Sequence, residues 1–393
     1  MTRAPGSFRR GDGRWVHVYA DGCHGSPPRD LAESSAPTTA GTRSRLRWDA
    51  VAEEWVVMAA HRSRRPFHAE SLCPLCPAPA SEEWETEECE IPGGEYDVAV
   101  FDNRYPAFAG LPLRTPVPGA PGLLTDAPAA GACEVVSFDS GHTRTLAELP
   151  LRRLRTVIGA WADRTLFLND RQDIAQVVCF ENHGAEVGAS LSHPHGQIYG
   201  YPFPPSRFRQ MREAARRVRD ARGTCVFCDI VAAESAAGER VVVAGRRWIA
   251  IVPFAARWPF EVHLFARRHL PDLPALDEEE RAELAVVYRS VLRRFAAVGE
   301  NPLPYMAVWV QAPARQDREL SHLHVQIFSD RGATGRVKRL AAGELGTGAW
   351  VSEADPEQAA AALRKADPSW RQPDGVRTAG DGSRQRGGHH VGQ

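Results

Sequence analysis

The chain has 393 residues, of which 43% are hydrophobic and 25% are charged, and its formal net charge is -1 at pH 7. These values are typical of a soluble globular protein with two or three domains. The near-neutral charge argues against a protein that coats nucleic acid or a membrane surface. No stretch approaches about 18 consecutive apolar residues, and no apolar signal core follows Met1, so we expect a cytoplasmic protein without nucleic-acid or membrane partners.

The first part of the chain is expected to contain an N-terminal arm, two strands and a basic cluster. Residues 1–45 are rich in Gly, Pro, Ser, Thr and Arg, which predicts a flexible N-terminal arm, with residues 15–19 as a peripheral strand. Residues 55–60 predict a buried strand. The basic cluster at 61–66 suits a phosphate grip and, equally, a plain solvated turn.

The remaining elements fall into two series with the same order. The first series predicts strands at 96–101, 134–138 and 175–180, with a helix at 149–168. The second predicts strands at 240–244, 248–253, 261–265 and 305–311, with a helix at 277–297. His142 and His193 are 51 residues apart, and His269 and His322 are 53 apart. A duplicated α+β unit explains this correspondence.

Each half also carries a Cys-x-x-Cys pair, which in a reducing compartment indicates metal ligation or redox chemistry. Two thiolates and two imidazoles form a Cys₂His₂ set that suits Zn²⁺ in a closed, structural site. The alternative in each half is a buried pair of free thiols beside unrelated histidines. The predicted zinc ligands are Cys73, Cys76, His142 and His193 in the first half and Cys225, Cys228, His269 and His322 in the second.

The centre of the first half is the sequence His193-Pro194-His195-Gly196-Gln197. In an extended segment the two histidines point to the same face, and the proline fixes the backbone between them. One ring can then ligate a metal while the other offers a nitrogen as a nucleophile or general base. A lone His-x-His is more often an ordinary loop, but the metal ligands around this one favour a functional site.

The sequence Phe-Glu-Asn-His-Gly at 180–184, followed by His-Pro-His-Gly-Gln at 193–197, carries a resemblance to a known family. These motifs resemble the active-site motif of the galactose-1-phosphate uridylyltransferases, a branch of the histidine-triad superfamily. The resemblance covers about residues 45–364. It implies an α+β fold of duplicated histidine-triad-like units, each an antiparallel sheet with flanking helices. We expect a catalytic unit at 46–215, a second unit at 216–364 and a disordered tail at 365–393.

The resemblance also implies a reaction in galactose metabolism. UMP passes from UDP-glucose to galactose 1-phosphate through a uridylyl-His195 intermediate, and the products are glucose 1-phosphate and UDP-galactose. Gln197 hydrogen-bonds the phosphoryl oxygens, because a sugar phosphate leaves as a stable anion and needs no general acid. We also expect a homodimer. The substrate-binding residues implied are Arg62, Arg65, Phe101, Asn103, Asn182, Gly188, Ser190, Gln197, Lys338 and Glu344.

Positions 104 and 311 distinguish this chain from relatives, and the second His-x-His raises a separate expectation. Asn103 is followed by Arg104, whereas many members of the family have Asn-Asp in this turn, which faces the nucleoside end of the substrate. Gln311 stands where some relatives use a glutamate to bind iron, and with Cys225 and Cys228 present this favours zinc. In the second half His324 keeps the His-x-His shape, and we expect it to be a structural relic.

Two other functions compete with this interpretation. An ADP-sugar phosphorylase of the same superfamily would move adenylyl to inorganic phosphate through the same His195. A non-enzymatic zinc-ribbon interaction module would need a basic face for nucleic acid, which the net charge of -1 does not favour.

Overall fold

The computed structural model describes residues 6–22, 44–64, 73–77, 89–91, 95–109, 121–189 and 191–367. Within these residues an 11-stranded sheet has the order β1-β2-β5-β7-β9-β8-β13-β14-β12-β11-β10, and every pair of neighbours is antiparallel. Its strands are β1 (Gly6–Arg9), β2 (Trp15–Tyr19), β5 (Val98–Asp102), β7 (Ala132–Ser137), β8 (Gln176–His183), β9 (His195–Tyr201), β10 (Val241–Ala244), β11 (Trp248–Ile251), β12 (Phe260–Ala266), β13 (Tyr305–Val310) and β14 (His324–Ser329).

The order of the strands confirms the duplicated α+β architecture. β5, β7, β9 and β8 of the first half are matched by β11, β12, β14 and β13 of the second, and β8 pairs with β13 where the halves meet. In each half one long helix connects corresponding strands, α1 (Leu151–Asp170) and α4 (Glu278–Ala297). The helices predicted at 149–168 and 277–297 are therefore confirmed to within two residues.

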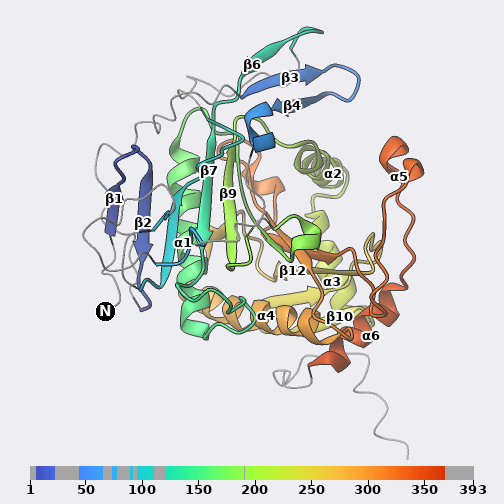
Figure 1. The fold of residues 1–393 in the computed structure, drawn as a ribbon. Helices are drawn as coiled ribbons and strands as arrows, with labels where there is room; N and C mark the ends of the chain where they lie inside the picture. The colour runs from blue at the N-terminus through green and yellow to red at the C-terminus, as the bar shows by residue number, and fades with distance from the viewer. Residues whose placement is uncertain are drawn as a thin grey trace, which may run out of the picture.

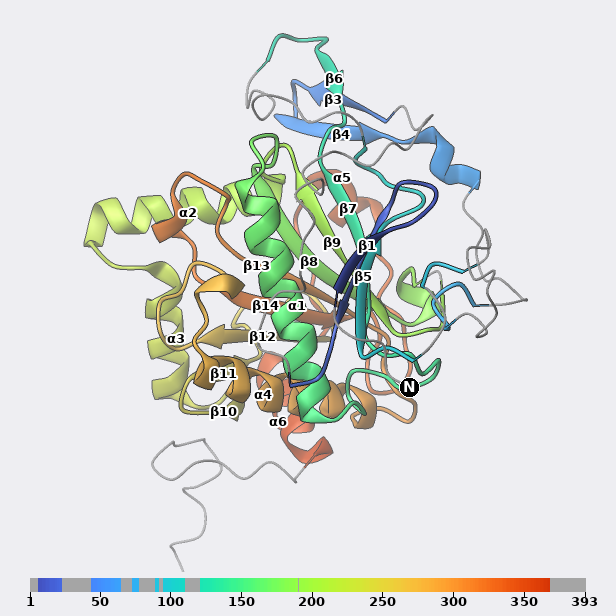
Figure 2. The same ribbon diagram turned by 90° about the vertical axis from the view of Figure 1, so that its left-hand side faces the viewer.

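α1 and α4 cover one face of the sheet, where α1 packs against β5, β8 and β9, and Figure 2 shows α1 running alongside β8. The apolar residues of both helices and of that face form one core, in which Trp161, Ile198 and Val325 are fully buried. α4 begins at Glu278 because Asp277 and Glu280 form a reciprocal capping box, with hydrogen bonds of 2.7 and 3.0 Å. Residues that alternate with this core on each strand point to the opposite face, where the candidate site lies.

The opposite face is partly covered by shorter elements, as Figure 1 shows. A second sheet has the order β4-β3-β6 and lies above the ends of β7 and β9. Its strands are β3 (Arg45–Asp49), β4 (Glu54–Met58) and β6 (Asp126–Pro128), and the other helices are α2 (Ser206–Arg222), α3 (Val226–Ala237) and α5 (Ala342–Thr347). α6 (Pro356–Ala366) instead packs against α4, and its Ala360 and Leu363 belong to the core of the first face. Single-turn 3₁₀ segments lie at Ala60–Arg64, Ala185–Val187, Leu273–Ala275 and Arg318–Leu320.

Three expectations about the first half need correction. β1 and β2 lie within the expected flexible arm, yet they join the main sheet; β2 coincides with the strand expected at 15–19, and its Val16 and Val18 are fully buried. The strand expected to be buried at 55–60 is instead half exposed, because β4 belongs to the small sheet and leaves Val56 and Met58 more than 40% exposed. α2 also runs through the expected boundary between residues 215 and 216. Most of the expected tail, residues 368–393, lies outside the described residues.

Candidate active site and metal centres

The first Cys/His set converges in space as the sequence predicted. The ligand atoms of Cys73, Cys76, His142 and His193 lie within 4.8 Å of one another. Cys76 Sγ is 3.3 Å from His142 Nδ1 and 3.6 Å from His193 Nδ1. His193 Nε2 lies 2.8 Å from the carbonyl oxygen of Asp139, so that nitrogen carries the proton and Nδ1 presents its lone pair to the thiols. The donor set and its tautomer fit a tetrahedral metal ion.

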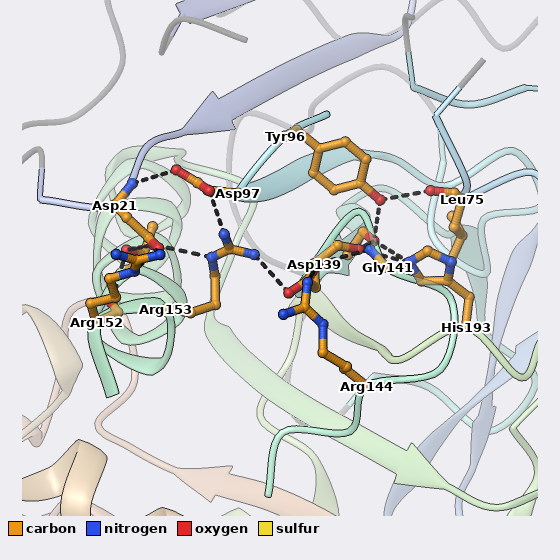
Figure 3. Close-up of polar contacts among 12 residues, drawn as sticks. Asp21, Leu75, Tyr96, Asp97, Asp139, Gly141, Arg144, Arg152, Arg153 and His193 are labelled. Carbon is orange, nitrogen blue, oxygen red and sulfur yellow. Dashed lines mark hydrogen bonds and ion pairs between the residues drawn. The ribbon is translucent and has the colours of Figure 1, made fainter. Parts of the chain in front are cut away.

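Polar contacts around this cluster hold its ligands in place (Figure 3). The Tyr96 hydroxyl donates to the carbonyl oxygen of Leu75, between the two cysteines, at 2.6 Å. The Asp139 carboxylate is held by Arg153 at 2.9 Å and by Arg144 at 3.0 Å. Burial lowers the pKa of His193 to about 4, which keeps its ring neutral at pH 7.

The second Cys/His set has the same form. The ligand atoms of Cys225, Cys228, His269 and His322 also lie within 4.8 Å of one another. Cys228 Sγ lies 3.4 Å from His322 Nδ1 and 3.6 Å from His269 Nδ1. Although burial opposes it, hydrogen bonds from His269 and His322 lower the pKa of Cys225 to about 5. Cys225 is the N-cap of α3, so the second Cys-x-x-Cys opens a helix.

His195 is fixed in one tautomer by the chain that carries it. Its Nδ1 lies 2.8 Å from the carbonyl oxygen of His193, so Nδ1 is the protonated nitrogen and Nε2 carries the lone pair. The ring begins β9 and is 8% exposed. The next residue must be glycine for β9 to pack this closely. A Cβ on Gly196 would lie 2.8 Å from Cζ of Phe138 and 3.0 Å from the backbone oxygen of Phe180.

A cavity of about 100 Å³ opens beside His195 and Gln197. Gln197 lies two residues along β9 on the same face, and its Oε1 is buried with no hydrogen-bond partner among the described residues. A half-turn of the amide exchanges its oxygen and nitrogen, so the same group can donate into the cavity. The complete lining is Pro74, Leu75, Glu90, Phe101, Asn103, Arg104, Tyr105, Val135, Leu191, His195 and Gln197.

Five of the other predicted substrate residues lie in the cavity wall or near the strands that form it. Phe101 and Asn103 line the cavity, and Asn182 lies on β8 beside His195, because Glu181 pairs with Gly196. Arg62 donates to the Tyr199 hydroxyl, on the same face of β9 as Gln197, at 3.3 Å. Gly188 adopts a φ of +91°, and a Cβ on it would lie 3.6 Å from the Asn182 amide nitrogen.

Of the remaining predicted residues, the two that the structure describes do not line the cavity. Lys338 and Glu344 form an ion pair with each other at 2.8 Å, beside α5. Arg65 and Ser190 lie outside the described residues. Sequence reasoning missed Glu90 as a lining residue, because the segment 89–91 belongs to no strand and carries no periodic signal.

In the second half the ring equivalent to His195 is enclosed. His324 Nδ1 lies 2.7 Å from the carbonyl oxygen of His322, which repeats the first-half geometry. Its Nε2, however, lies 3.2 Å from the Gln326 amide nitrogen, and the Phe265 ring stacks on it at 4.5 Å. Since the side chain is only 1% exposed, this histidine has no access to a substrate.

Two fused α+β units, each with a Cys₂His₂ cluster and a His-x-His that begins at one of its ligands, define a duplicated α+β protein in which the second histidine of one motif, His195, borders a cavity, whereas its counterpart His324 is buried. The models of the galactose-1-phosphate uridyl transferase N-terminal and C-terminal domains match residues 35–205 and 209–371. A galactose-1-phosphate uridylyltransferase of Streptomyces lividans is 39% identical over 79% of this chain and 81% of its own length. The chain therefore belongs to the galactose-1-phosphate uridylyltransferase family.

A comparison with solved structures agrees with the assignment of the chain to this family. A structure described as that of uridylyltransferase is 32% identical, with a TM-score of 0.72, and the match covers 82% of this chain and 98% of that one. An ADP-glucose phosphorylase from Arabidopsis thaliana has a TM-score of 0.61 at 22% identity over 83% of this chain and 99% of its own, which shows the shared fold alone. Across the described part of the chain, no helix is both long and apolar enough to cross a membrane.

Proposed function

We propose that this chain transfers UMP between UDP-glucose and galactose 1-phosphate, with His195 as the nucleophile. The observation that carries the proposal is the 2.8 Å contact between His195 Nδ1 and the carbonyl oxygen of His193. This contact leaves the lone pair on Nε2, and the cavity that Gln197 lines lies beside the same ring, which supports His195 as the attacking group. Family membership supports the choice of substrates.

The chemistry follows from this geometry. Nε2 of His195 forms a bond to the α-phosphorus, and the bond to the oxygen of glucose 1-phosphate breaks. The leaving group departs as a phosphate anion, so no proton is needed. The positive charge that develops on the ring is stabilised by the Nδ1–H bond to the His193 carbonyl. An oxygen of galactose 1-phosphate then attacks the same phosphorus and releases neutral His195.

Neighbouring groups bind the phosphates and sugars in this proposal. The Gln197 amide donates to the phosphoryl oxygens in both half-reactions, and Arg62, which Tyr199 holds, contributes positive charge on the same face. Residues proposed on the family resemblance alone are Arg65, Gly188, Ser190, Lys338 and Glu344.

We further propose that both Cys₂His₂ clusters bind zinc. Two sulfur and two imidazole donors suit Zn²⁺, and a cluster with four protein ligands serves structure rather than catalysis. When bound, the ion would anchor the Cys-x-x-Cys loop to the backbone that leads into His195. The cysteine thiols suit a reducing compartment such as the cytoplasm. Exposed apolar side chains on the small sheet, Val56 and Met58 of β4, support a homodimer as part of this proposal.

The experiment is direct detection of the intermediate. The enzyme is incubated with UDP-glucose or, in parallel, ADP-glucose, and the labelled peptide is located by mass spectrometry. We expect a uridylyl group on His195 and parallel lines in double-reciprocal plots with galactose 1-phosphate. Adenylyl labelling with release by inorganic phosphate would instead identify an ADP-sugar phosphorylase.

A matched pair of variants tests the role of the ring. His195→Gly is expected to abolish turnover, while added imidazole, attacking in its place, forms uridylyl-imidazole. His183→Asn is the control, because His183 stacks on Tyr305 and does not line the cavity. Normal turnover by His195→Gly, or labelling of another residue in the wild type, would contradict the assignment.

A further inference from the structure

The first turn of α1 carries arginines where a helix normally carries acidic residues. Arg152 and Arg153 lie there, and the turn contains no acidic residue. The start of a helix favours negative charge, because its free N–H groups point outward along the axis. The corresponding helix of the second half follows that rule, since the first turn of α4 carries Glu278, Glu279 and Glu280. The arginines of α1 must therefore be explained by their tertiary contacts.

Arg153 uses each nitrogen of its guanidinium group for a different carboxylate, as Figure 3 shows. Its Nε donates to Asp21 at 3.0 Å, and its Nη1 lies 2.9 Å from Asp139 Oδ2. Its Nη2 donates to Asp97. The side chains of Arg153 and Asp139 are only 9% and 1% exposed. A planar guanidinium holds three acceptors in fixed directions, so this buried group fixes three segments of chain relative to one another.

One of these segments is the N-terminal hairpin formed by β1 and β2. Asp21 follows β2 by two residues, and its backbone N–H donates to Asp97 Oδ2 at 2.7 Å. The Thr156 hydroxyl of α1 donates to Asp21 Oδ1, also at 2.7 Å. The hairpin precedes residue 35, where the match to the family's N-terminal model begins. Arg153 therefore connects this hairpin to the loop after β7, which contains Asp139.

Asp139 is the residue whose backbone orients a predicted metal ligand. Its carbonyl oxygen lies 2.8 Å from His193 Nε2. Arg144 holds its other carboxylate oxygen at 3.0 Å, so both sides of the carboxylate are fixed and the direction of the carbonyl is fixed with them. The carbonyl oxygen of His193 lies in turn 2.8 Å from His195 Nδ1. Three successive contacts thus lead from Arg153 to the ring of His195.

The second half provides an internal comparison. There the carbonyl oxygen that His322 Nε2 contacts, at 2.6 Å, belongs to Ala266, which has no charged side chain to be held. The loop after β12 is tied to α4 by Arg268, which is 57% exposed and lies 2.8 Å from Glu280. The second histidine of that motif, His324, is enclosed. The buried clamp on the carbonyl-bearing residue therefore occurs in the half whose second histidine borders the cavity.

We propose that Arg153 is a positioning residue for His195, and that the N-terminal hairpin completes the clamp through Asp21. Arg153 holds Asp139, and the Asp139 carbonyl orients His193. The His193 carbonyl then orients the ring of His195. The proposal rests on the proposed function for the role of His195 as the nucleophile. A nucleophile must be held within about 0.5 Å of its productive position, and a displacement of about 1 Å can cost about 10²-fold in rate.

The test measures the rate at which UMP passes from UDP-glucose to His195 in a single turnover, by rapid quench. Asp139→Asn keeps the backbone carbonyl but removes the charge that Arg153 holds. We expect the transfer rate to fall by about 10- to 100-fold in Asp139→Asn and in Arg153→Met, while the Kd of UDP-glucose changes by less than about threefold. Asp21→Asn should lower the rate several-fold. Arg155→Met is the matched control on the same helix, because Arg155 is half exposed and pairs with Glu278 of α4.

Zinc release to a chromogenic chelator is the second readout, and it needs no substrate. We expect one of two zinc equivalents to leave about tenfold faster from Asp139→Asn than from the wild type, because contacts behind a ligand tune its hold on the metal. If the wild type takes up no UMP, the proposed function fails, and unchanged zinc release would then overturn the clamp as well.

A wild-type transfer rate in folded Asp139→Asn and Arg153→Met would overturn the proposal, even with faster zinc release or a lower melting temperature, because the clamp would then serve stability alone. A rise in the Kd of UDP-glucose as large as the fall in rate would also overturn it, since the residues would then act on binding. If Arg153→Met does not fold, Asp139→Asn and Asp21→Asn carry the test.

Discussion

Replacing Glu181 by Gln is expected to remove a pH dependence from the folding stability. Glu181 lies in β8 at the junction of the two halves and is 3% exposed. The Tyr305 hydroxyl donates to its Oε1 at 2.9 Å, and Oε2 has no hydrogen-bond partner among the described residues. Burial raises the pKa of this carboxyl to about 8, against an ordinary value of 4.5.

The direction of this pH dependence follows from the number of protons bound in the native and unfolded states. Between pH 4.5 and 8 the native state keeps a proton on Glu181 that the unfolded state has lost, so stability falls as the pH rises. At about 1.4 kcal/mol per pH unit, the interval between the two pKa values corresponds to a loss of about 5 kcal/mol in the free energy of unfolding. Local relaxation and water entry soften the cost of a buried charge, so a measured loss of about 2–5 kcal/mol is expected. The neutral amide of Glu181→Gln avoids it.

Urea unfolding of the wild type and of Glu181→Gln at pH 5.5, 6.5, 7.5 and 8.5 provides the measurement. The difference between the two proteins isolates Glu181, because the other titrating groups are common to both. We expect similar stability at pH 5.5 and a more stable variant at pH 8.5. Glu213→Gln on α2 is the exposed control, for which no such trend is expected. Parallel stability curves for wild type and Glu181→Gln would refute the reasoning.

Three further outcomes are expected. Cys76→Ala should lose one equivalent of zinc and unfold at a lower temperature while KM changes less, because closed sites contribute folding free energy; well-folded wild type without zinc would count against this. Gln197→Ala should slow both half-reactions by roughly 10²-fold, and Gln197→His should shift the intermediate towards hydrolysis, as rapid-quench measurements would show. Gly196→Ala should cost about 1–3 kcal/mol of stability and reduce labelling of His195, because its Cβ meets the Phe138 ring and the Phe180 carbonyl; a variant as stable and active as wild type would show that these neighbours yield.

The sequence by itself determined the duplication and the chemistry of the site. The same order of Cys-x-x-Cys, His and His-x-His in both halves, with 51 and 53 residues between the two histidine ligands, identified eight residues that the fold brings into two clusters. Alternation along the strands placed His195 and Gln197 on one face, because the period of a strand is local. The capped start of α4 was equally readable, since capping involves neighbouring residues.

Tertiary structure alone decided what depends on contacts between distant segments. The N-terminal hairpin has the composition of a loose arm, and it is ordered because Arg14 and Trp15 bond to Asp102 at the end of β5. β4 has the sequence of a buried strand but is half exposed, because it pairs only within the small sheet. Both His-x-His sequences look alike, yet Phe265 encloses His324 while His195 borders a cavity. Such differences arise from packing between remote residues, which no local pattern records.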